Sequence, residues 1–265
     1  MGRRRSQTEL TVRWHDGDRR RAPDDLAVEE PLEIHLDGAL VATTMRTPGH
    51  DFELAAGFCH ADGLLAGAPV ETCRYCATGS AVDTAFNIVT VETGGRAPTP
   101  TPRLGTTSTS CGLCGSTSID ELCDRLTPLA PLDPAPDLAV LVRVPELVQP
   151  HQELFARTGA VHAAAAFDLA NGEATVVRED VGRHNAVDKV AGHLLLAGAL
   201  PARGLGLFVS GRASFELVQK AWAAGFGVVV AVSAPTALAV ETARRAGIVL
   251  VGFVRDGHAN VYAEP

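Results

Sequence analysis

The second half of this chain alternates short, uninterrupted apolar strands with amphipathic helices, and this alternation restricts the fold classes that the chain can adopt. The expected strands and helices are 185–197 (helix), 205–209 (strand), 213–224 (helix), 227–232 (strand), 236–246 (helix) and 248–254 (strand). A strand that is apolar at every position, such as 227–232, is buried on both faces, which indicates a parallel sheet covered by helices on both sides. We therefore predict an α/β domain.

A helix and a two-stranded hairpin precede this alternation. Apolar strands over 161–168 and 174–178 flank Asn171-Gly172, a pair typical of a tight hairpin turn. A helix is expected over 146–157, after a proline-rich boundary that begins at Pro128. We place the α/β domain at residues 141–265.

The segment 31–140 is expected to form a smaller α+β region. Strands 32–36 and 40–44 flank Asp37-Gly38 and predict a hairpin. A helix is expected from Asp51 to Gly63, and a further strand over 83–91. Residues 93–115 are predicted to form a mobile loop, because 93–110 are nearly all Gly, Pro, Thr, Ser and Arg.

The first 30 residues contain seven arginines, which are Arg3, Arg4, Arg5, Arg13, Arg19, Arg20 and Arg21. Such a segment could bind nucleic acid or an acidic partner, or act as a twin-arginine export signal. No apolar region follows Arg5, so the export hypothesis is rejected, and we predict a disordered basic tail with no nucleic-acid partner.

The remaining composition favours a cytoplasmic protein. No stretch reaches the roughly 18 apolar residues that a membrane span needs. The six cysteines in a chain of this kind favour metal or redox chemistry over a disulfide scaffold.

Cys111 and Cys114 lie three positions apart between glycines, in the sequence CGLCG. Ser118 and Glu121 follow at the spacing of a capping box, so a helix is expected to begin there with its positive end toward the two sulfurs. A thiolate stabilised in this way, with a second thiol near it, is typical of a reactive cysteine site.

Two alternatives remain for these cysteines. Cys73 and Cys76 form a second pair at the same spacing, and two such pairs can build a four-thiolate zinc site. Dithiol/disulfide exchange suits either pair chemically, although the order of elements expected around a thioredoxin-like motif is missing. Cys59 and Cys123 lie on expected helices and are interpreted as packing residues.

Three polar turns follow the parallel strands, at the edge where such sheets bind ligands. They are Ser210-Gly211-Arg212, Ser233-Ala234-Pro235-Thr236 and Arg255-Asp256-Gly257-His258. Two of them lead into helices, whose first amides can hold phosphate groups, and the arginines can add bidentate contacts. The simpler interpretation is that Ser233 and Pro235 only begin a helix. The glycine fingerprints of dinucleotide and nucleoside triphosphate enzymes are both absent.

The order of elements in this half is similar to that of the cytidine deaminase fold. Deaminases hold zinc with an H-x-E motif and a P-C-x-x-C motif at two helix starts. Neither is present: Gly182-Arg183-His184-Asn185 lacks the glutamate, and the start at Gly211 has no cysteine. We therefore predict no deamination. The charged cluster from Arg183 to Lys189 is interpreted either as a positioning site or as a structural network.

Four motifs together resemble the FdhD/NarQ family of formate dehydrogenase accessory sulfurtransferases. They are residues 107–115 (TSTSCGLCG), residues 179–189 (EDVGRHNAVDK), the turn at 210–212 and the turn at 233–236. The match runs from about Pro31 to the C-terminus. The resemblance implies a cytidine deaminase-like C-terminal domain and a smaller α+β region carrying the Cys-x-x-Cys loop.

The same resemblance implies a sulfur carrier. A cysteine desulfurase would load Cys111 with a persulfide, Cys114 would assist, and the sulfur would pass to a molybdenum cofactor, Mo-bis(molybdopterin guanine dinucleotide), before its insertion into formate dehydrogenase. Cofactor binding is implied at Phe253-Val254-Arg255-Asp256-Gly257-His258, and we add Ser210, Gly211, Arg212, Ser233 and Thr236. The family leads us to expect a homodimer without a permanently bound metal. The competing prediction is a zinc-stabilised nucleotide-binding or interaction protein that uses Cys73, Cys76, Cys111 and Cys114.

Overall fold

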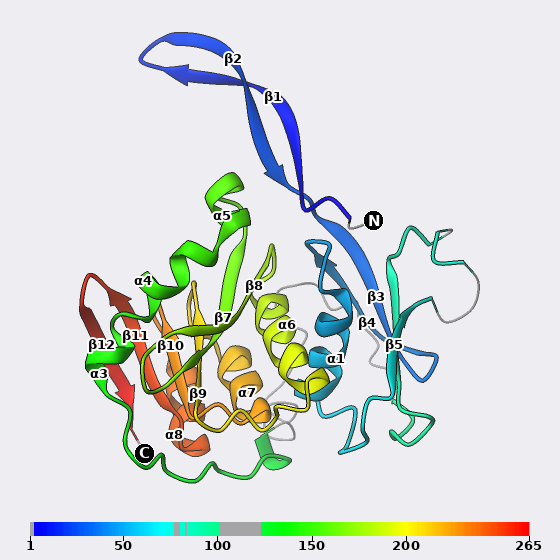
Figure 1. The fold of residues 1–265 in the computed structure, drawn as a ribbon, viewed down its shortest axis with the longest axis vertical. Helices are drawn as coiled ribbons and strands as arrows, with labels where there is room; N and C mark the ends of the chain where they lie inside the picture. Colours follow the sequence, from blue (N-terminus) through cyan, green and yellow to red (C-terminus); the bar gives the residue numbers. More distant parts are fainter. Residues whose placement is uncertain (1–2, 77–79, 83, 101–122, 265) are drawn as a thin grey trace.

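The structure, a computed structural model, describes residues 3–76, 80–82, 84–100 and 123–264. Two lobes lie side by side, and a long hairpin projects from them (Figure 1). The larger lobe is built on a six-stranded sheet and the smaller on a four-stranded sheet. The chain is therefore a mixed α/β protein, as the sequence predicts. The proposed limits at residues 31 and 141 stay predictions.

The six-stranded sheet has the order β12-β11-β10-β9-β7-β8. Its strands are β7 (His162–Asp168), β8 (Ala174–Asp180), β9 (Leu205–Val209), β10 (Val228–Ala231), β11 (Val249–Arg255) and β12 (His258–Ala263). β9, β10 and β11 are parallel, whereas β7 runs antiparallel to β9. The first residues of β7 therefore lie at the same edge as the last residues of β9.

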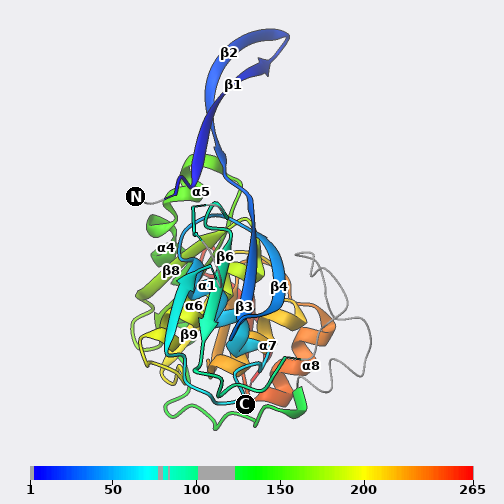
Figure 2. The same ribbon diagram turned by 90° about the vertical axis from the view of Figure 1, so that its right-hand side faces the viewer.

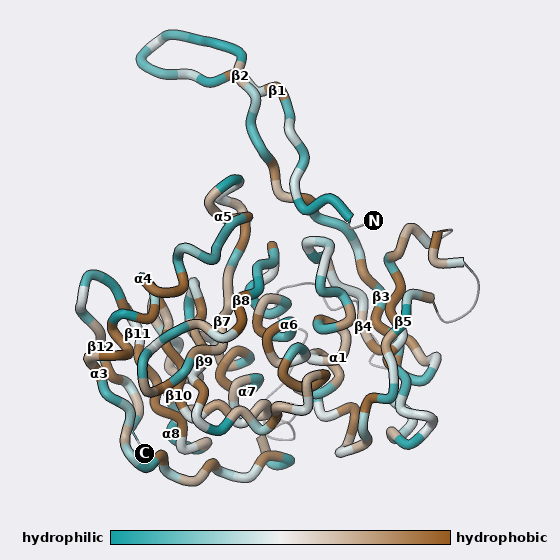
Figure 3. The backbone as a smooth tube through the Cα atoms, in the orientation of Figure 1, coloured by the Kyte–Doolittle hydropathy of each residue, from teal (hydrophilic) through white to brown (hydrophobic). Residues whose placement is uncertain are grey.

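Helices cover both faces of this sheet. One face packs against α6 (Arg183–Leu196), α7 (Phe215–Ala224) and α8 (Ala237–Ala246), and the other against α3 (Leu138–Leu141) and α4 (Val144–Val148). Side chains of β10 alternate between the two cores, since Val229 belongs to the first and Val228 to the second. Figure 3 shows this apolar character along the strands. Burial on both faces explains why the central strands β9 and β10 contain no polar side chain.

The smaller lobe packs one helix on its sheet. Its strands have the order β4-β3-β6-β5, and they are β3 (Glu30–Leu36), β4 (Ala39–Arg46), β5 (Thr72–Tyr75) and β6 (Ile88–Glu92). Helix α1 (Asp51–Ala61) covers this sheet with Leu54, Ala55 and Cys59. The predicted hairpin around Asp37-Gly38 and the helix from Asp51 are confirmed.

The lobes meet where α1 crosses α6 at two glycines. A Cβ atom added at Gly57 would lie 1.9 Å from the carbonyl oxygen of Asp188, and one added at Gly192 would lie 1.8 Å from that of Glu53. No side chain fits at either position. The two helix backbones are therefore in direct contact.

Three expectations for local structure need correction. The helix expected over 146–157 is broken into α4, a 3-10 turn (Gln149–His151) and α5 (Glu153–Thr158), because Pro150 cannot donate a backbone hydrogen bond. The strand expected over 83–91 begins only at Ile88, since Ala85 and Phe86 have positive φ. Strands β5 and β12 were not predicted. The helix expected near Ser118 lies almost wholly outside the described residues.

The N-terminal segment also differs from the expected disordered tail. Residues Ser6–His15 (β1) and Asp18–Ala27 (β2) pair in one antiparallel hairpin. The turn is Asp16-Gly17, with φ of 47° and 92°, which suits a two-residue hairpin connection. The alternation Thr8, Leu10, Val12, Trp14 is the strand signal, and the surrounding arginines obscure it.

Glu53 of α1 binds the larger lobe through ionic hydrogen bonds. Arg178 of β8 donates from Nε to Oε2 at 2.5 Å and from Nη2 to Oε1 at 2.8 Å, and His193 Nδ1 lies 3.0 Å from Oε1. Burial by itself would raise the pKa of Glu53. The hydrogen bonds from Arg178, His50 and His193 outweigh burial and hold this pKa far below its usual range.

We expect Glu53→Gln to lower the free energy of unfolding at pH 7 by about 2 kcal/mol, because hydrogen bonds to a charged group are lost. A carboxyl with a depressed folded pKa stabilises above the unfolded pKa of about 4.3, and this stabilisation is lost as pH falls. The variant should therefore show a flatter acid limb in urea melts between about pH 5 and pH 2. Glu241→Gln, on an exposed residue of α8, is the control. Equal acid sensitivity of wild type and Glu53→Gln would contradict this assignment.

Candidate functional site at the carboxyl edge of the sheet

The turns after β9 and β10 lie side by side at the carboxyl edge. Ala213 and Pro235 form an isolated parallel bridge, and the Thr236 amide donates to the carbonyl of Ala213 at 3.0 Å. The amide of Phe253 on β11 donates to the carbonyl of Ser233 at 3.2 Å. Residues from three strands are thus brought together, as their shared edge predicts.

Phe253 stands out because its backbone is strained. Its φ is 53°, which is rare for a bulky residue, and β11 has a register shift against β12 between Gly252 and Arg255. The bulge leaves the Phe253 side chain 39% exposed. Strain of this kind is retained where the surrounding structure over-determines it, often at ligand sites.

The turn after β11 closes a short hairpin with β12. Asp256 and Gly257 both have positive φ, and Arg255 pairs with His258. A cavity of about 510 Å³ opens here. Its lining residues are Phe253, Arg255, Asp256, His258, Ala259 and Asn260. Residues 253–258 were predicted to bind a cofactor, and four of these six residues therefore line the same cavity.

Some predicted site residues have structural partners. Ser210 Oγ accepts a hydrogen bond from the Ala163 amide at 2.9 Å, and Thr236 Oγ1 caps α8 by accepting from the Ala239 amide at 3.2 Å. The Val254 side chain is fully buried in the core. The N-cap residue of α8 is thus Thr236, whereas the sequence predicted Ser233 as the cap. Arg212 and Arg255 are exposed and have no ion-pair partner among the described residues.

His162 also lies at this edge, although the sequence did not identify it as a candidate site residue. This residue begins β7, and a Cβ atom added at Gly211 would lie 3.5 Å from its Nδ1. Burial lowers the pKa of His162, and the charges of Arg183 and His184 lower it further. The buried Nε of Arg183 has no hydrogen-bond partner among the described residues. The only sequence signal was the strand expected over 161–168, because the antiparallel pairing of β7 with β9 that brings His162 to Gly211 is a property of the folded sheet.

The cluster from Arg183 to Lys189 joins the two lobes. Lys189 is fully buried, its Nζ lies 2.6 Å from Asp180 Oδ2, and it donates to the carbonyl of Thr47 at 2.9 Å. Asp180 accepts from the Thr47 amide at 3.1 Å and from Asn185 Nδ2 at 2.9 Å. Thr47 lies between β4 and α1. Of the two interpretations of this cluster, a structural network therefore accounts for Lys189.

His184 contacts polar side chains at the start of α7. Its Nε2 lies 2.6 Å from Glu216 Oε2 on α7 and 3.5 Å from Ser214 Oγ. Within residues 3–76, 80–82, 84–100 and 123–264, no group of three or more His, Cys, Asp or Glu side chains could hold a metal ion.

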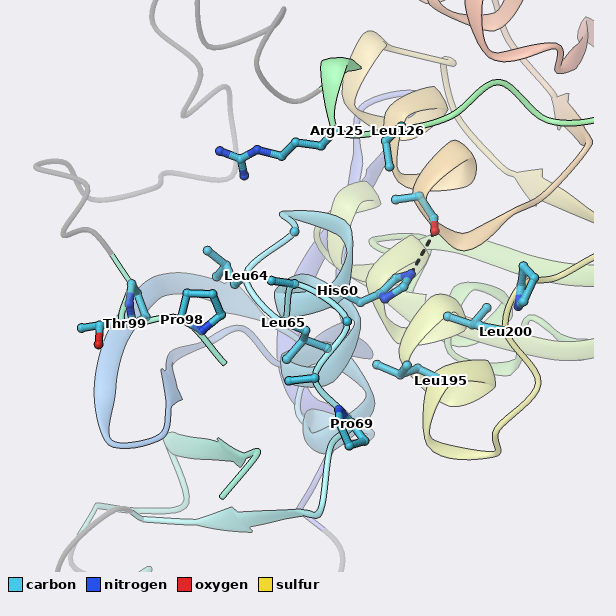
Figure 4. Close-up of a pocket in the computed structure, with 17 residues that line it drawn as sticks. His60, Leu64, Leu65, Pro69, Pro98, Thr99, Arg125, Leu126, Leu195 and Leu200 are labelled. Atoms are coloured by element: carbon cyan, nitrogen blue, oxygen red, sulfur yellow. Dashed lines mark hydrogen bonds between the residues drawn. The ribbon is translucent and has the colours of Figure 1, made fainter. Parts of the chain in front are cut away.

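Cys111 and Cys114 lie outside the described residues, but the described ends of their segment line one pocket. Pro98, Thr99 and Pro100 border it from one end, and Arg125 and Leu126 from the other (Figure 4). The pocket has a volume of about 1100 Å³ and is mainly apolar, with Leu64, Leu65, Pro69, Leu195 and Leu200 in its wall. His60 Nε2 lies 3.0 Å from the carbonyl oxygen of Ala223.

This pocket lies at the opposite end of the helices from the carboxyl edge. His60, Leu195 and Ala223 are near the C-terminal ends of α1, α6 and α7, whereas the carboxyl-edge turns lead into the N-terminal ends of α7 and α8. Helix α7 has 10 residues, which corresponds to about 15 Å. The candidate ligand edge and this pocket are therefore separated by about one helix length.

The other cysteines have unreactive environments. Burial raises the pKa of the Cys59 thiol strongly, and that of Cys73 to about 11. Cys76 is buried, with its Sγ 3.1 Å from Thr84 Oγ1. Cys123 is buried too, which agrees with the packing role expected for it and for Cys59.

These features define a two-lobed mixed α/β protein with a candidate ligand edge on its larger sheet and a CGLCG motif in the chain between β6 and α3. No helix among the described residues has the length and apolar character needed to cross a bilayer. Comparison with known proteins takes the assignment further. The FdhD/NarQ family matches residues 27–265, and the chain belongs to this family.

Relatives at high identity agree with this assignment. The chain is 48% identical over 251 residues to a "Sulfur carrier protein FdhD" of Corynebacterium efficiens, with 91% of this chain and 90% of the relative covered. A protein of the same description from Streptomyces coelicolor is 48% identical over 262 residues, covering 95% and 92%. The crystal structure of a putative formate dehydrogenase accessory protein from Desulfotalea psychrophila superposes with a TM-score of 0.79 at 25% identity, covering 99% and 98%.

Proposed function

We propose that this chain is a sulfur carrier that takes sulfane sulfur from a cysteine desulfurase as a persulfide on Cys111. The observation that carries the proposal is the CGLCG motif at 111–115 in a chain nearly half identical to proteins described as sulfur carriers. The other four cysteines add support, because Cys59, Cys76 and Cys123 are buried, and partial burial raises the pKa of the Cys73 thiol to about 11.

The transfer is a thiolate exchange on sulfur. The Cys111 thiolate attacks the terminal sulfur of the donor's persulfide, a new S–S bond forms on Cys111, and the donor cysteine leaves as a thiolate. In the delivery step, attack of Cys114 on the Cys111 sulfur would release the terminal sulfur as hydrosulfide and leave a disulfide. A cellular dithiol must then reduce that disulfide. Because sulfur would pass from the donor through Cys111 to an acceptor, the chain would act as a sulfurtransferase.

The acceptor in this proposal is Mo-bis(molybdopterin guanine dinucleotide), bound as substrate. Its phosphate and guanine groups would lie at the carboxyl edge, against Gly211, Arg212, Ser233 and residues 253–258. In each of its two dinucleotide halves, the metal-binding pterin would be at the opposite end from the guanine. An elongated acceptor suits a site separated by about one helix length from the pocket where the cysteine segment begins and ends.

We also propose that the larger lobe is a cytidine deaminase-like domain without deaminase chemistry. The hairpin β7–β8 followed by three parallel strands, with α6, α7 and α8 on one face, supports the likeness. The starts of α6 and α7 correspond to the helix starts where deaminases hold zinc, and in this chain they would contribute to a nucleotide site. Formate dehydrogenase is the proposed recipient of the matured cofactor, and the chain would act in the cytoplasm as a homodimer.

Mass spectrometry tests the carrier role. The purified protein is incubated with a cysteine desulfurase and cysteine, and peptides are then compared with and without a reductant. We expect a reducible gain of one sulfur atom on Cys111. Absence of this gain at every cysteine, together with stoichiometric zinc in the untreated protein, would favour the alternative, a zinc-stabilised nucleotide-binding or interaction protein using Cys73, Cys76, Cys111 and Cys114.

We expect Arg212→Ala to weaken binding of GDP by about tenfold, the loss of one good ionic contact, while Cys111 still gains sulfur. Arg203→Ala is the matched control, because Arg203 is exposed at the amino end of β9 and so lies at the opposite edge. Isothermal titration with GDP measures the effect. Unchanged affinity in Arg212→Ala would remove Arg212 from the site.

A further inference from the structure

The imidazole of His162 lies at the open end of the core beneath α6, α7 and α8. Alternate residues of a strand share a face, and Ala164 and Ala166 of β7 pack in that core. His162, at the first position of β7, is therefore directed to the same side, and it is only partly buried. A Cβ atom added at Gly211 would lie 3.5 Å from its Nδ1 and 3.6 Å from its Cε1. The ring thus borders the turn that leads from β9 into α7.

Most charged groups that act on this ring are positive. Burial disfavours the imidazolium of His162 most strongly, and Arg183 and His184 at the start of α6 disfavour it further, so its pKa lies below the usual value. Asp180, the residue paired with His162 across β7 and β8, acts in the opposite direction. Arg212 is exposed in the facing turn. Two elements around the ring, α6 and the turn after β9, thus contribute positive charge.

The carboxylates near the ring already have partners. Asp180 is fully buried with its Oδ2 2.6 Å from Lys189 Nζ, and three further donors bind its two oxygens. Glu216 of α7 places its Oε2 2.6 Å from His184 Nε2. Neither carboxylate is therefore available to neutralise a charged His162.

Two groups near this turn have nitrogen atoms without a partner. The Nε atom of Arg183 is buried and has no hydrogen-bond partner in the described part of the chain, and within the same residues the ring of His162 has none either. A buried donor without an acceptor costs free energy, so an acceptor that binds here recovers it. A diphosphate diester suits the site, because it carries two negative charges and several acceptor oxygens. Arg212 can add a bidentate contact.

We infer that His162 is a proton-linked contact for the diphosphate of the nucleotide ligand, and that its ring takes a proton from solvent when the ligand binds. The inference rests on the proposed function, because it concerns the nucleotide site proposed for this edge. In the free protein, burial and the neighbouring positive charges keep the ring neutral near neutral pH. Two negative charges beside the ring reverse this balance. The imidazolium then donates a charge-assisted hydrogen bond to a phosphate oxygen.

Proton uptake makes the affinity depend on pH. The pKa of His162 is lower in the free protein than in the complex, so affinity is highest below the free-state pKa and falls as pH rises through the pKa of the complex. An opposite charge close to an ionisable group commonly moves its pKa enough for about a tenfold change in affinity. We therefore expect the ligand to bind about tenfold more tightly at about pH 5.5 than at about pH 8.

Isothermal titration with GDP-mannose tests the inference. The diphosphate of this probe is a diester, so the probe itself does not titrate over this pH range. Wild type should show the tenfold change, whereas His162→Gln should gain less than about twofold on acidification. His15→Gln is the matched control and should keep the wild-type profile. His15 ends β1 at the tip of the hairpin of β1 and β2, which projects away from both lobes (Figures 1 and 2).

Proton uptake can also be measured directly. Titrations at about pH 6.5 in two buffers with different heats of ionisation give the number of protons bound with the ligand, which should be lower in His162→Gln than in wild type by about 0.5. His184 and His258 remain in both proteins, so the difference isolates His162.

The possible failures are distinguishable. Equal pH profiles of wild type and His162→Gln overturn the inference and leave the nucleotide site in place. Failure of wild type to bind GDP-mannose at up to about 1 mM overturns the inference and the nucleotide site together. Persulfide formation on Cys111 is measured separately, so neither result is mistaken for a failure of the carrier role.

Discussion

Replacing Cys111 with alanine is expected to abolish sulfur loading of the chain, and with it formate dehydrogenase activity in cells that depend on this protein. The physical reason is that the proposed persulfide needs a thiolate at this position. Among the remaining cysteines, burial raises the thiol pKa of Cys59 strongly and that of Cys73 to about 11. A protonated, shielded thiol cannot replace Cys111 as the nucleophile.

Cys114→Ala is the informative comparison. If Cys114 acts only in the delivery step, this variant should still gain one sulfur atom on Cys111, yet accumulate it because release is slow. Mass spectrometry after desulfurase treatment and formate dehydrogenase assays in a complemented deletion strain measure the two steps separately. Sulfur loading in Cys111→Ala equal to wild type would refute the assignment of Cys111.

Replacing Gly192 with alanine is expected to lower the free energy of unfolding by about 3 kcal/mol, the upper end of the usual cost of forcing a methyl group into a packed interior. The added Cβ atom would lie 1.8 Å from the Glu53 carbonyl oxygen and 2.8 Å from the Gly57 nitrogen. Both contacts are with backbone, so no side chain can rotate away. The helices α1 and α6 must then move apart, which also disturbs the bonds between Thr47, Asp180 and Lys189.

The sign of this effect is diagnostic. In a helix free of such a contact, glycine to alanine stabilises by up to about 1 kcal/mol. Thermal unfolding followed by circular dichroism should show a melting temperature lower by on the order of 10 °C for Gly192→Ala. Gly211→Ala is the control, because its Cβ atom would meet nothing closer than His162 Nδ1 at 3.5 Å. A stabilised Gly192→Ala variant would show that the helices are not in contact there.

Much of the larger lobe could be predicted because burial on both faces leaves a continuous apolar signature. Strand 227–232 and the helices beside it were recognised in this way, and the structure differs by a few residues at their ends. Strand β12 lacks this signature, since an antiparallel edge strand is half exposed and its sequence, HANVYA, alternates weakly. The hairpin at 6–27 was missed because its apolar alternation is interleaved with arginines.

For the candidate site, the sequence identified the turns but could not separate binding residues from structural ones. Ser210 and Thr236 have local hydrogen-bond partners, and Val254 is buried, although all three belong to the predicted set. His162 approaches Gly211 from nearly fifty positions away along the chain. Such proximity depends on how strands pair, which composition and spacing do not encode directly.

Residue types and local spacing were enough to predict the candidate chemistry: two thiols in CGLCG, polar turns after apolar strands, and the motifs that mark the family. These are properties of residue type and local spacing. Three features could be seen only in the folded chain. Lys189 and Asp180 join the lobes through Thr47, and two glycines allow α1 to pack against α6. The pocket at the ends of the cysteine segment lies about one helix length from the carboxyl edge. Such distances follow from helix packing and strand order, because contacts between residues more than a hundred positions apart exist only once the chain has folded.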